Sequence, residues 1–410
     1  MKFVVVTYGT EGDARPLAAL CRALMDAGHQ ARLLADAATL GTAESLGIST
    51  VVLAGDIRGT LQSSGSVSHV VNQGGNFNRT ANALAGIANA NAEAWLRAIV
   101  GAGEGCDAII VSGLAAFVGF SAAEHLGVKA IGAGLIPITP TMAFPSPFLP
   151  PKWVPRYFNR MSHQFVNGLL WLAFRKATNA ARAKVCGLAA RRAGWNSHSM
   201  LYGISPSLLP RPGDWPENAQ VCGQWVPPSS GWAPPQTLRD FLAAGEAPLY
   251  IGFGSMVGFD QRRLMKEILA AVAGRRVLFY PGWSGVDTAS LPANFLVVGD
   301  TPHSWLFPQT SLVIHHGGSG TAHSAARAGV PSVVVPFAGD QFFWAERLRQ
   351  AGVATGAVNG KDLRAQALKQ AIEFAETDQV RARARALGER MRAEDGLANA
   401  TVAIEKIMAR

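Results

Sequence analysis

The feature that most constrains the fold is an alternation of short apolar segments with helical patterns, which occurs twice along the 410-residue chain. In the first third, we expect strands at KFVVVTY, QARLLAD, STVVLAG, DAIIVSG and KAIGAGL, with helices between them. Because these strands are almost uninterrupted apolar runs, both faces of their sheet should be covered by helices. The pattern therefore predicts a doubly wound α/β domain with a parallel sheet.

The same alternation restarts after the segment PPSSGWAPP, whose prolines and glycine are typical of a linker. Further strands are expected at PLYIGFGS, RRVLFYPG, FLVVGD, SLVIHHGG and SVVVPF. We expect two Rossmann-like domains, residues 1–226 and 238–410, joined by a linker at 227–237. The final helix could pack back on the first domain. Ligands should bind in the cleft between the domains, at the carboxyl ends of the strands.

Composition narrows the class of protein. Hydrophobic residues make up 49% and charged residues 16%, which favours a folded chain over a disordered one. The net charge of +9 is concentrated partly at residues 152–192 and 379–392. Such clusters could attract an anionic lipid surface or an anionic ligand, although a solvated helix face is the simpler interpretation. Since no nucleic-acid motif accompanies them, we expect no nucleic-acid partner.

Cysteine usage and the apolar segments bear on location. The four cysteines are widely spaced and contain no CxxC pair, which is typical of reduced thiols in a cytoplasmic enzyme. The first residues do not form a signal-peptide pattern. A long uncharged run, Ala130 to Pro151, contains six prolines and is therefore expected to be a loop rather than a membrane span. No sequence feature indicates an oligomeric state.

The segment HHGGSGTAHSAARAG, from His315 to Gly329, runs from a strand through a glycine cluster into a helix. Glycines let a ligand approach the main chain closely. A helix beginning near Ser319 would direct unpaired amides and its positive dipole end into the cleft. This favours a phosphate site with His316 at its rim, and a purely structural turn is the alternative. We expect no metal, because His315 and His316 point to opposite faces of a strand and no further ligand adjoins them.

The turn and the following ARAGVPSVVVPFAGDQFFWAERL resemble the donor-binding signature of nucleotide-sugar glycosyltransferases of the GT-B fold. The resemblance is to the branch of sterol glucosyltransferases and glycopeptide-antibiotic glucosyltransferases. It extends through TYGTEGDARP, LYGISPSLLPRPGDWPENAQVCGQW, YIGFGSM and GDTPHSWLF, and so covers most of the chain. It implies an inverting, metal-independent transfer of a hexose from a UDP- or dTDP-sugar, with the UDP-sugar favoured. The acceptor would be a hydroxyl of a sterol, polyketide, antibiotic aglycone or hydroxylated lipid, and no cofactor is needed beyond the nucleotide sugar.

The resemblance also implies the donor-binding residues. Asp340 and Gln341 would bond sugar hydroxyls, a role that suits a carboxylate and an amide, although Asp340 could instead cap a helix. Asp300 stands where plant members have a tryptophan, so that base stacking would fall to Trp305 or Trp283. The remaining donor-binding residues lie in the glycine turn and in two other loops: Gly254, Ser255, His303, His316, Gly318, Ser319, Gly320 and Thr321.

Asp13 is the catalytic candidate. Its segment GTEGDARP resembles the family's GSxGDxxP loop, whose aspartate acts as general base, and a helix N-cap is the alternative. An ordinary aspartate, with a pKa of about 3.9, is a weak base that burial would strengthen. The acceptor should bind in the N-terminal domain, where aromatic residues suit an apolar molecule. These acceptor-binding candidates are Phe77, Phe144, Phe148 and Trp153.

Two other classes of protein compete with a transferase. A nucleotide-sugar epimerase would bind the same donor but would need no apolar acceptor pocket. A non-catalytic auxiliary protein that binds a sugar nucleotide would be expected to lack Asp13 or the Asp340–Gln341 pair, and this chain has both. A glycosyltransferase is therefore the preferred interpretation.

Overall fold

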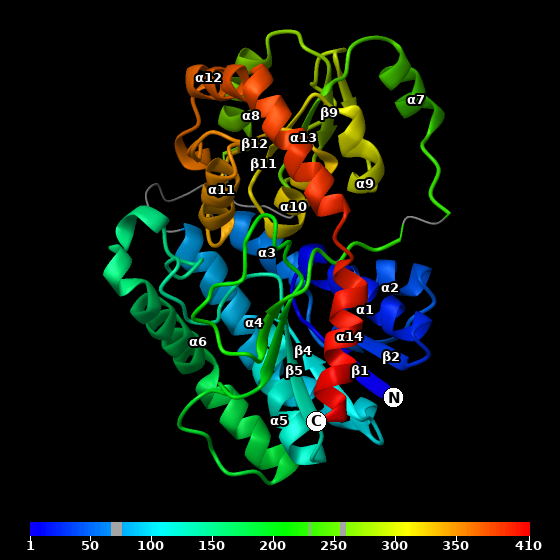
Figure 1. Ribbon diagram of the computed structural model, residues 1–410, viewed down its shortest axis with the longest axis vertical. Coiled ribbons are helices and arrows are strands. Elements are labelled where there is room, and N and C mark those ends of the chain that lie inside the picture. Colours follow the sequence, from blue (N-terminus) through cyan, green and yellow to red (C-terminus); the bar gives the residue numbers. More distant parts are fainter. Residues whose placement is uncertain (67–75, 229–230, 255–259) are drawn as a thin grey trace.

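A computed structural model describes residues 1–66, 76–228, 231–254 and 260–410, without the side chains of residues 62–80. The chain forms two α/β domains, one above the other in Figure 1. Each domain contains one sheet, and all strand pairs among the described residues of the two sheets are parallel. The predicted fold class is confirmed.

The N-terminal sheet has the strand order β3-β2-β1-β4-β5-β6-β7. Its strands are β1 (Lys2–Val6), β2 (Gln30–Asp36), β3 (Ser49–Leu53), β4 (Ala108–Val111), β5 (Lys129–Gly134), β6 (Ser199–Tyr202) and β7 (Ala219–Val221). The first five correspond to the predicted strands, whereas β6 and β7 were not predicted. The accompanying helices are α1 (Glu11–Asp26), α2 (Gly41–Ser45), α3 (Ile57–Ser66), α4 (Asn76–Gly103), α5 (Ala116–Leu126) and α6 (Asn159–Ala181).

The strands are continuously apolar because both faces of this sheet are buried. In β1, Phe3 and Val5 belong to the hydrophobic cluster on one face, while Val4 and Val6 belong to the cluster on the other. Residues of α1 complete the first cluster, and residues of α4, such as Trp95, complete the second. Alternate side chains of a strand point to opposite faces, so each strand supplies both layers of the core.

The C-terminal sheet has the order β10-β9-β8-β11-β12 and is likewise buried on both faces. Its strands are β8 (Leu249–Gly252), β9 (Val277–Tyr280), β10 (Phe295–Val297), β11 (Leu312–His315) and β12 (Ser332–Val334). All five coincide with predicted segments. The helices of this part are α7 (Gln236–Ala243), α8 (Gln261–Val272), α9 (His303–Leu306), α10 (Ser319–Ala328), α11 (Gln341–Gln350), α12 (Ala365–Ala375) and α13 (Asp378–Arg392).

The chain passes between the domains twice. The last helix, α14 (Gly396–Ala409), returns to the N-terminal domain and lies beside α1 (Figure 1), where Ala403 and Ile404 join the same cluster as Leu17. The two passages touch at Gly223 and Gly396, since a Cβ on Gly223 would lie 2.7 Å from the Gly396 Cα. Both positions therefore require glycine.

A shared apolar cluster holds the domains together beside this crossing. The rings of Phe144 and Phe343, one from each domain, lie 5.2 Å apart, and Tyr202 and Trp344 belong to the same cluster. No helix among the described residues is both long and apolar enough to cross a membrane. The four cysteines are unpaired.

Candidate active site

A cleft of about 3030 Å³ lies between the domains and is lined by residues of both. Its N-terminal side is formed largely by segments that follow β1, β4 and β5, such as Gly9, Ser112 and Leu135. Its C-terminal side includes Asp340 and Gln341, at the start of α11. The cleft thus occupies the carboxyl ends of the strands, where ligands bind in doubly wound sheets.

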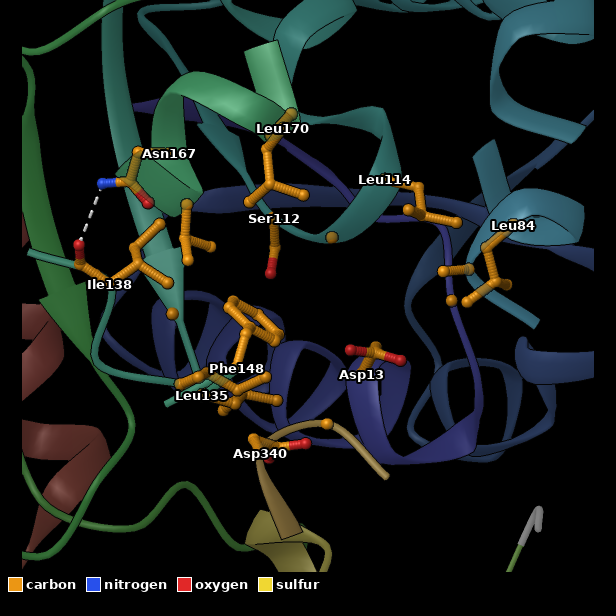
Figure 2. A pocket seen from close by; sticks show the side chains of 18 of the residues that line it. Asp13, Leu84, Ser112, Leu114, Leu135, Ile138, Phe148, Asn167, Leu170 and Asp340 are labelled. Carbon is orange, nitrogen blue, oxygen red and sulfur yellow. Dashed lines mark hydrogen bonds between the residues drawn. The ribbon is translucent and has the colours of Figure 1, made fainter. Parts of the chain in front are cut away.

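Asp13 points into this cleft from the first turn of α1 (Figure 2). Thr10 is the N-cap of that helix, and its backbone N–H donates to Asp13 Oδ2 at 2.8 Å. The Thr10 hydroxyl lies 3.3 Å from the same oxygen. Gly9 is required beside this carboxylate, because a Cβ there would lie 2.3 Å from Oδ2. Asp13 thus occupies the third helical position rather than the N-cap.

The environment of Asp13 strengthens it as a base. Burial raises the pKa of this carboxyl group, and the two bonds from Thr10 only partly oppose that effect. Both of those bonds end on Oδ2. Oδ1 is therefore the oxygen that can accept a proton from a molecule bound in the cleft.

Asp340 faces Asp13 across the cleft (Figure 2). It precedes α11, and its Oδ2 accepts a hydrogen bond from the Trp344 indole at 3.0 Å instead of capping the helix. Burial raises the pKa of Asp340 to about 6, and the charge of Asp13 adds to the shift. Each carboxylate therefore makes the other harder to ionise, and a ligand with several hydroxyl groups would relieve both by donating to them.

Gln341 shapes the adjoining loop. Its side-chain Oε1 accepts hydrogen bonds from the backbone N–H groups of Phe337 and Ala338, at 2.7 and 3.2 Å. A Cβ on Gly317 would lie 2.9 Å from the Gln341 carbonyl oxygen. The Asp340–Gln341 segment and the glycine turn are therefore packed directly against each other.

The glycine turn leads from β11 into α10 as predicted. Gly317 has a φ of +94° and donates its N–H to His315 Nδ1 at 3.1 Å, while His315 is fully buried. The first bond within the helix runs from Ala322 N–H to the Gly318 carbonyl. The amides of Ser319, Gly320 and Thr321 precede that bond, so they form the first-turn N–H groups that a helix leaves for an anion.

His316 fills the space between two glycines. A Cβ on Gly318 would lie 2.5 Å from its Nε2, and one on Gly254 would lie 3.0 Å from its Cε1. Burial lowers the pKa of His316 to about 4, so the ring is neutral near pH 7 and can donate only one N–H. The structure thus brings His316 together with Gly254 and Gly318. Ser255 lies outside the described residues.

The other predicted donor-side residues are distributed over neighbouring loops. His303 begins α9 and stacks on Phe307 with ring centroids 4.2 Å apart; burial lowers its pKa to about 4. Of the two stacking candidates, Trp283 lines the cleft. Trp305 instead packs on Trp232, away from the cleft lining.

Asp300 pairs with the opposite domain. Arg15 of α1 donates to both carboxylate oxygens of Asp300, from Nη1 at 2.9 Å and from Nη2, and also bonds Glu11. The side chains of Arg15 and Asp300 are 33% and 60% exposed, so solvent screens the pair. This ion pair joins the helix that carries Asp13 to the loop that follows β10.

The acceptor candidates divide into two groups. Phe148 projects into the cleft near Leu135 and Asp340 (Figure 2). Phe144 is buried between the domains, and Trp153 is 77% exposed; neither is among the residues that line the cleft. Phe77 falls in the first turn of α4, where side chains lie outside the described residues.

Comparison with known proteins places this geometry in a family. Residues 262–404 match the family described as "Erythromycin biosynthesis protein CIII-like, C-terminal domain". The O-mycaminosyltylonolide 6-deoxyallosyltransferase of Streptomyces fradiae is 33% identical, over 99% of the chain and 97% of that protein. The chain belongs to this family of glycosyltransferases.

Longer relatives and solved structures agree with that assignment. The sterol 3-beta-glucosyltransferase of Neurospora crassa is 31% identical over 98% of this glycosyltransferase chain, which spans only 27% of that relative's length. The crystal structure of the glycosyltransferase VinC in complex with dTDP superimposes with a TM-score of 0.67 at 17% identity, over 100% of both chains. The GT-B fold that the sequence predicted is thereby confirmed.

Some cleft residues of the glycosyltransferase were not predicted. Ser112 follows β4 and points into the cleft, and Asn167 of α6 donates to the Ile138 carbonyl at 3.1 Å beside it (Figure 2). The position of Ser112 near the carboxyl end of the predicted strand DAIIVSG was a usable signal, because that end of every strand in such a sheet faces the ligand. Among the described residues, no three His, Cys, Asp or Glu side chains gather closely enough to hold a metal ion.

Proposed function

We propose that this glycosyltransferase transfers a hexose from a UDP- or dTDP-sugar to a hydroxyl group of an apolar or aromatic small molecule, with inversion and without a metal ion. One observation carries the proposal: Asp13 and Asp340 face each other from opposite domains across a single cleft (Figure 2). A base for the acceptor and a ligand for the sugar are thus available at one point, between separate binding regions for acceptor and donor.

The donor side supports binding of a pyrophosphate. The first-turn amides of α10 and the neutral His316 offer hydrogen-bond donors, and the helix dipole adds partial positive charge. Asp340 and Gln341 would hold sugar hydroxyls beside them. Thymidine diphosphate is a candidate because the VinC structure contains dTDP. Uridine diphosphate is the candidate that the sequence resemblance implies.

The reaction would be a direct displacement at the anomeric carbon. Asp13 Oδ1 takes the proton as the acceptor oxygen bonds to that carbon, and the bond from the carbon to the phosphate oxygen breaks. The electron pair leaves with the nucleoside diphosphate, whose growing negative charge the α10 amides stabilise. Attack from the face opposite the leaving group inverts the anomeric centre.

The acceptor side supports an apolar molecule. Leu84, Leu114, Leu135, Ile138 and Phe148 surround the space above Asp13, and Ser112 and Asn167 add polar groups (Figure 2). Pockets with mostly apolar walls and few polar groups bind hydrophobic ligands. The named relatives act on a sterol and on O-mycaminosyltylonolide, which makes sterols and polyketides the first acceptors to test.

The decisive experiment incubates the protein with UDP- and dTDP-hexoses, first alone and then with a panel of sterols and hydroxylated polyketides. We expect glycoside only when acceptor is present. The anomeric coupling constant of the product should show the configuration opposite to that of the donor. The rate should be the same with and without EDTA. Isomerised sugar nucleotide without acceptor would instead identify an epimerase. Binding of the nucleotide sugar without any turnover would identify an auxiliary protein.

A further inference from the structure

A group of large apolar side chains lies exposed on the N-terminal domain, on α6 and the segment just before it. We call this group the α6 patch; its residues are Trp153, Tyr157, Phe158, Met161 and Phe165. Trp153 and Tyr157 are 77% and 87% exposed, and the other three are more than half exposed. All five lie outside the lining of the cleft, so a bound acceptor would not cover them.

The helix α6 is apolar on two opposite sides. Its inward side, which includes Val166 and Phe174, is buried against the domain. Its outward side carries Met161 and Phe165, which are one turn apart and both exposed. Figure 1 shows α6 on the outer side of the N-terminal domain, away from α1 and α14. A helix on a water-facing surface normally has a polar outer side, so the apolar outer side of α6 is typical of a surface that contacts another molecule.

The charge around the patch indicates what covers it. The sequence contains no Asp or Glu between Glu124 and Asp214. Within that stretch Lys152, Arg156 and Lys176 are exposed on or next to α6. Arg160 also lies there, paired with Asp214 at 3.0 Å. Aromatic rings flanked by lysine and arginine are the composition of a surface that inserts into the interface of an anionic bilayer.

The patch adjoins the acceptor side of the cleft. Leu169, Leu170 and Leu172, from the same helix, are exposed and also line the cleft. Arg160 and Gln164, nearer the start of the helix, line it as well. An apolar path therefore leads from the α6 patch to the space above Asp13.

We propose that the α6 patch docks the protein on an anionic lipid surface, so that a membrane-dissolved acceptor enters the cleft without crossing water. The rings of the patch would lie at the level of the lipid head groups, and Lys152, Arg156 and Lys176 would contact the lipid phosphates. The part concerning acceptor entry rests on the proposed function, whereas the docking itself does not.

The test measures co-sedimentation of the full chain with vesicles of phosphatidylcholine alone and of phosphatidylcholine with phosphatidylglycerol. We expect binding to the anionic vesicles, weakened by salt. The apolar variant W153S/Y157S/F165S should bind at least about tenfold more weakly. The charge variant R156E/K176E should show a similar loss. The matched control R385E/R390E makes the same change in net charge on α13, in the other domain, and should bind as wild type.

Uridine or thymidine diphosphate affinity, measured by calorimetry, should be equal in all variants and shows that each is folded. Equal binding to both kinds of vesicle, equal losses in R156E/K176E and R385E/R390E, or no vesicle binding by wild type would each overturn the proposal. The last result would indicate that the α6 patch binds a protein partner instead of a lipid surface. Transfer to an acceptor dissolved in detergent tests the proposed function separately, because it needs no docking.

Discussion

At the scale of single residues, Asp13 combines a structural role with a proposed chemical one. Its Oδ2 accepts a hydrogen bond from the Thr10 N–H at the start of α1, while Oδ1 receives no bond from Thr10. Asp13→Asn keeps an acceptor for Thr10 but cannot take a proton. We therefore expect a loss of turnover of about 10²–10⁴-fold in Asp13→Asn, with nucleoside diphosphate affinity unchanged, as measured by steady-state kinetics and calorimetry.

The comparison variant for this prediction is Asp13→Ala, which loses both roles. It should be as inactive as Asp13→Asn. Its free energy of unfolding should be lower by about 1 kcal/mol, because the hydrogen bond from the Thr10 N–H to the Asp13 carboxylate is lost. If Asp13→Asn retained near wild-type turnover, the aspartate would serve only the helix, and another base would be required.

The elevated pKa of Asp340 predicts a dependence of stability on pH. The unfolded chain releases this proton near the ordinary value of 3.8, and the folded chain releases it near 6. Between these values the folded state binds more protons, so the free energy of unfolding falls as pH rises. The full shift corresponds to at most about 3 kcal/mol. Urea unfolding at several pH values should show that wild type loses stability relative to Asp340→Asn over this range, because the titration of Asp13 and the other groups is common to both proteins.

Above pH 7 the difference in free energy of unfolding between Asp340→Asn and wild type should be constant. The carboxyl group of Asp340 is then ionised in both the folded and the unfolded wild type. A difference that is the same at every pH would contradict the assignment of the shift to Asp340. Donor added in excess should bind the ionised carboxylate through its hydroxyls and reduce the decline.

Individual site residues could be predicted from the sequence where the local pattern allows only one backbone geometry. The glycine turn was found because a strand, three glycines and a helix follow in order. The place of Asp13 in α1 was not, because the helix begins at Glu11, before its first buried apolar residue. The aromatic residues of the irregular segment before α6 gave no period, so the sequence could not separate buried Phe144 and exposed Trp153 from cleft-lining Phe148.

At the scale of elements, the junction of β11 and α10 makes distinct demands on two of its glycines. Gly317 has a positive φ, and a Cβ there would meet Val334 at 2.8 Å. Gly320 lies in the first turn of α10 with nothing within 4 Å of its Cβ position. We expect Gly317→Ala to lower the free energy of unfolding by about 1–3 kcal/mol and to weaken nucleoside diphosphate binding as well.

Gly320→Ala is the matched variant for that junction. It should leave stability unchanged or slightly improved, since alanine favours a helix by about 0.5–1 kcal/mol over glycine. It should nevertheless weaken nucleoside diphosphate binding, because the open space above Gly320 is where we place the phosphates. Full affinity in a stable Gly320→Ala protein would remove the phosphates from this end of α10.

Strands were predictable from sequence where they form apolar runs. All ten predicted strands are present, including β3, β10 and β12 at the edges of their sheets. In the central strands, burial on both faces makes the run continuous. The missed strands β6 and β7 have only four and three residues, and prolines and glycines surround them. They extend one edge of the N-terminal sheet, where the pairing of β6 with β5 and of β7 with β6, rather than a local pattern, decides the structure.

At the scale of the whole molecule, the Arg15–Asp300 pair connects the two sides of the cleft. Because solvent screens it, Asp300→Ala should change the free energy of unfolding by less than about 1 kcal/mol. It should still lower kcat/KM about two- to fivefold, as the α1 helix loses its link to the donor loop. The reversed pair R15D/D300R should recover most of this loss, and additive losses in the double variant would contradict the link.

The return of α14 to the N-terminal domain means that this domain is built from two separate stretches of the chain. A chimaera that exchanges donor domains at the linker alone would therefore import a foreign α14 against the native α1, and the mismatch would fall on Leu17, Ala403 and Ile404. A second junction just before Gly396 keeps the native helix on its own partner. Recombination of this glycosyltransferase with its relatives should thus succeed with two cuts, one on each side of the Gly223–Gly396 contact.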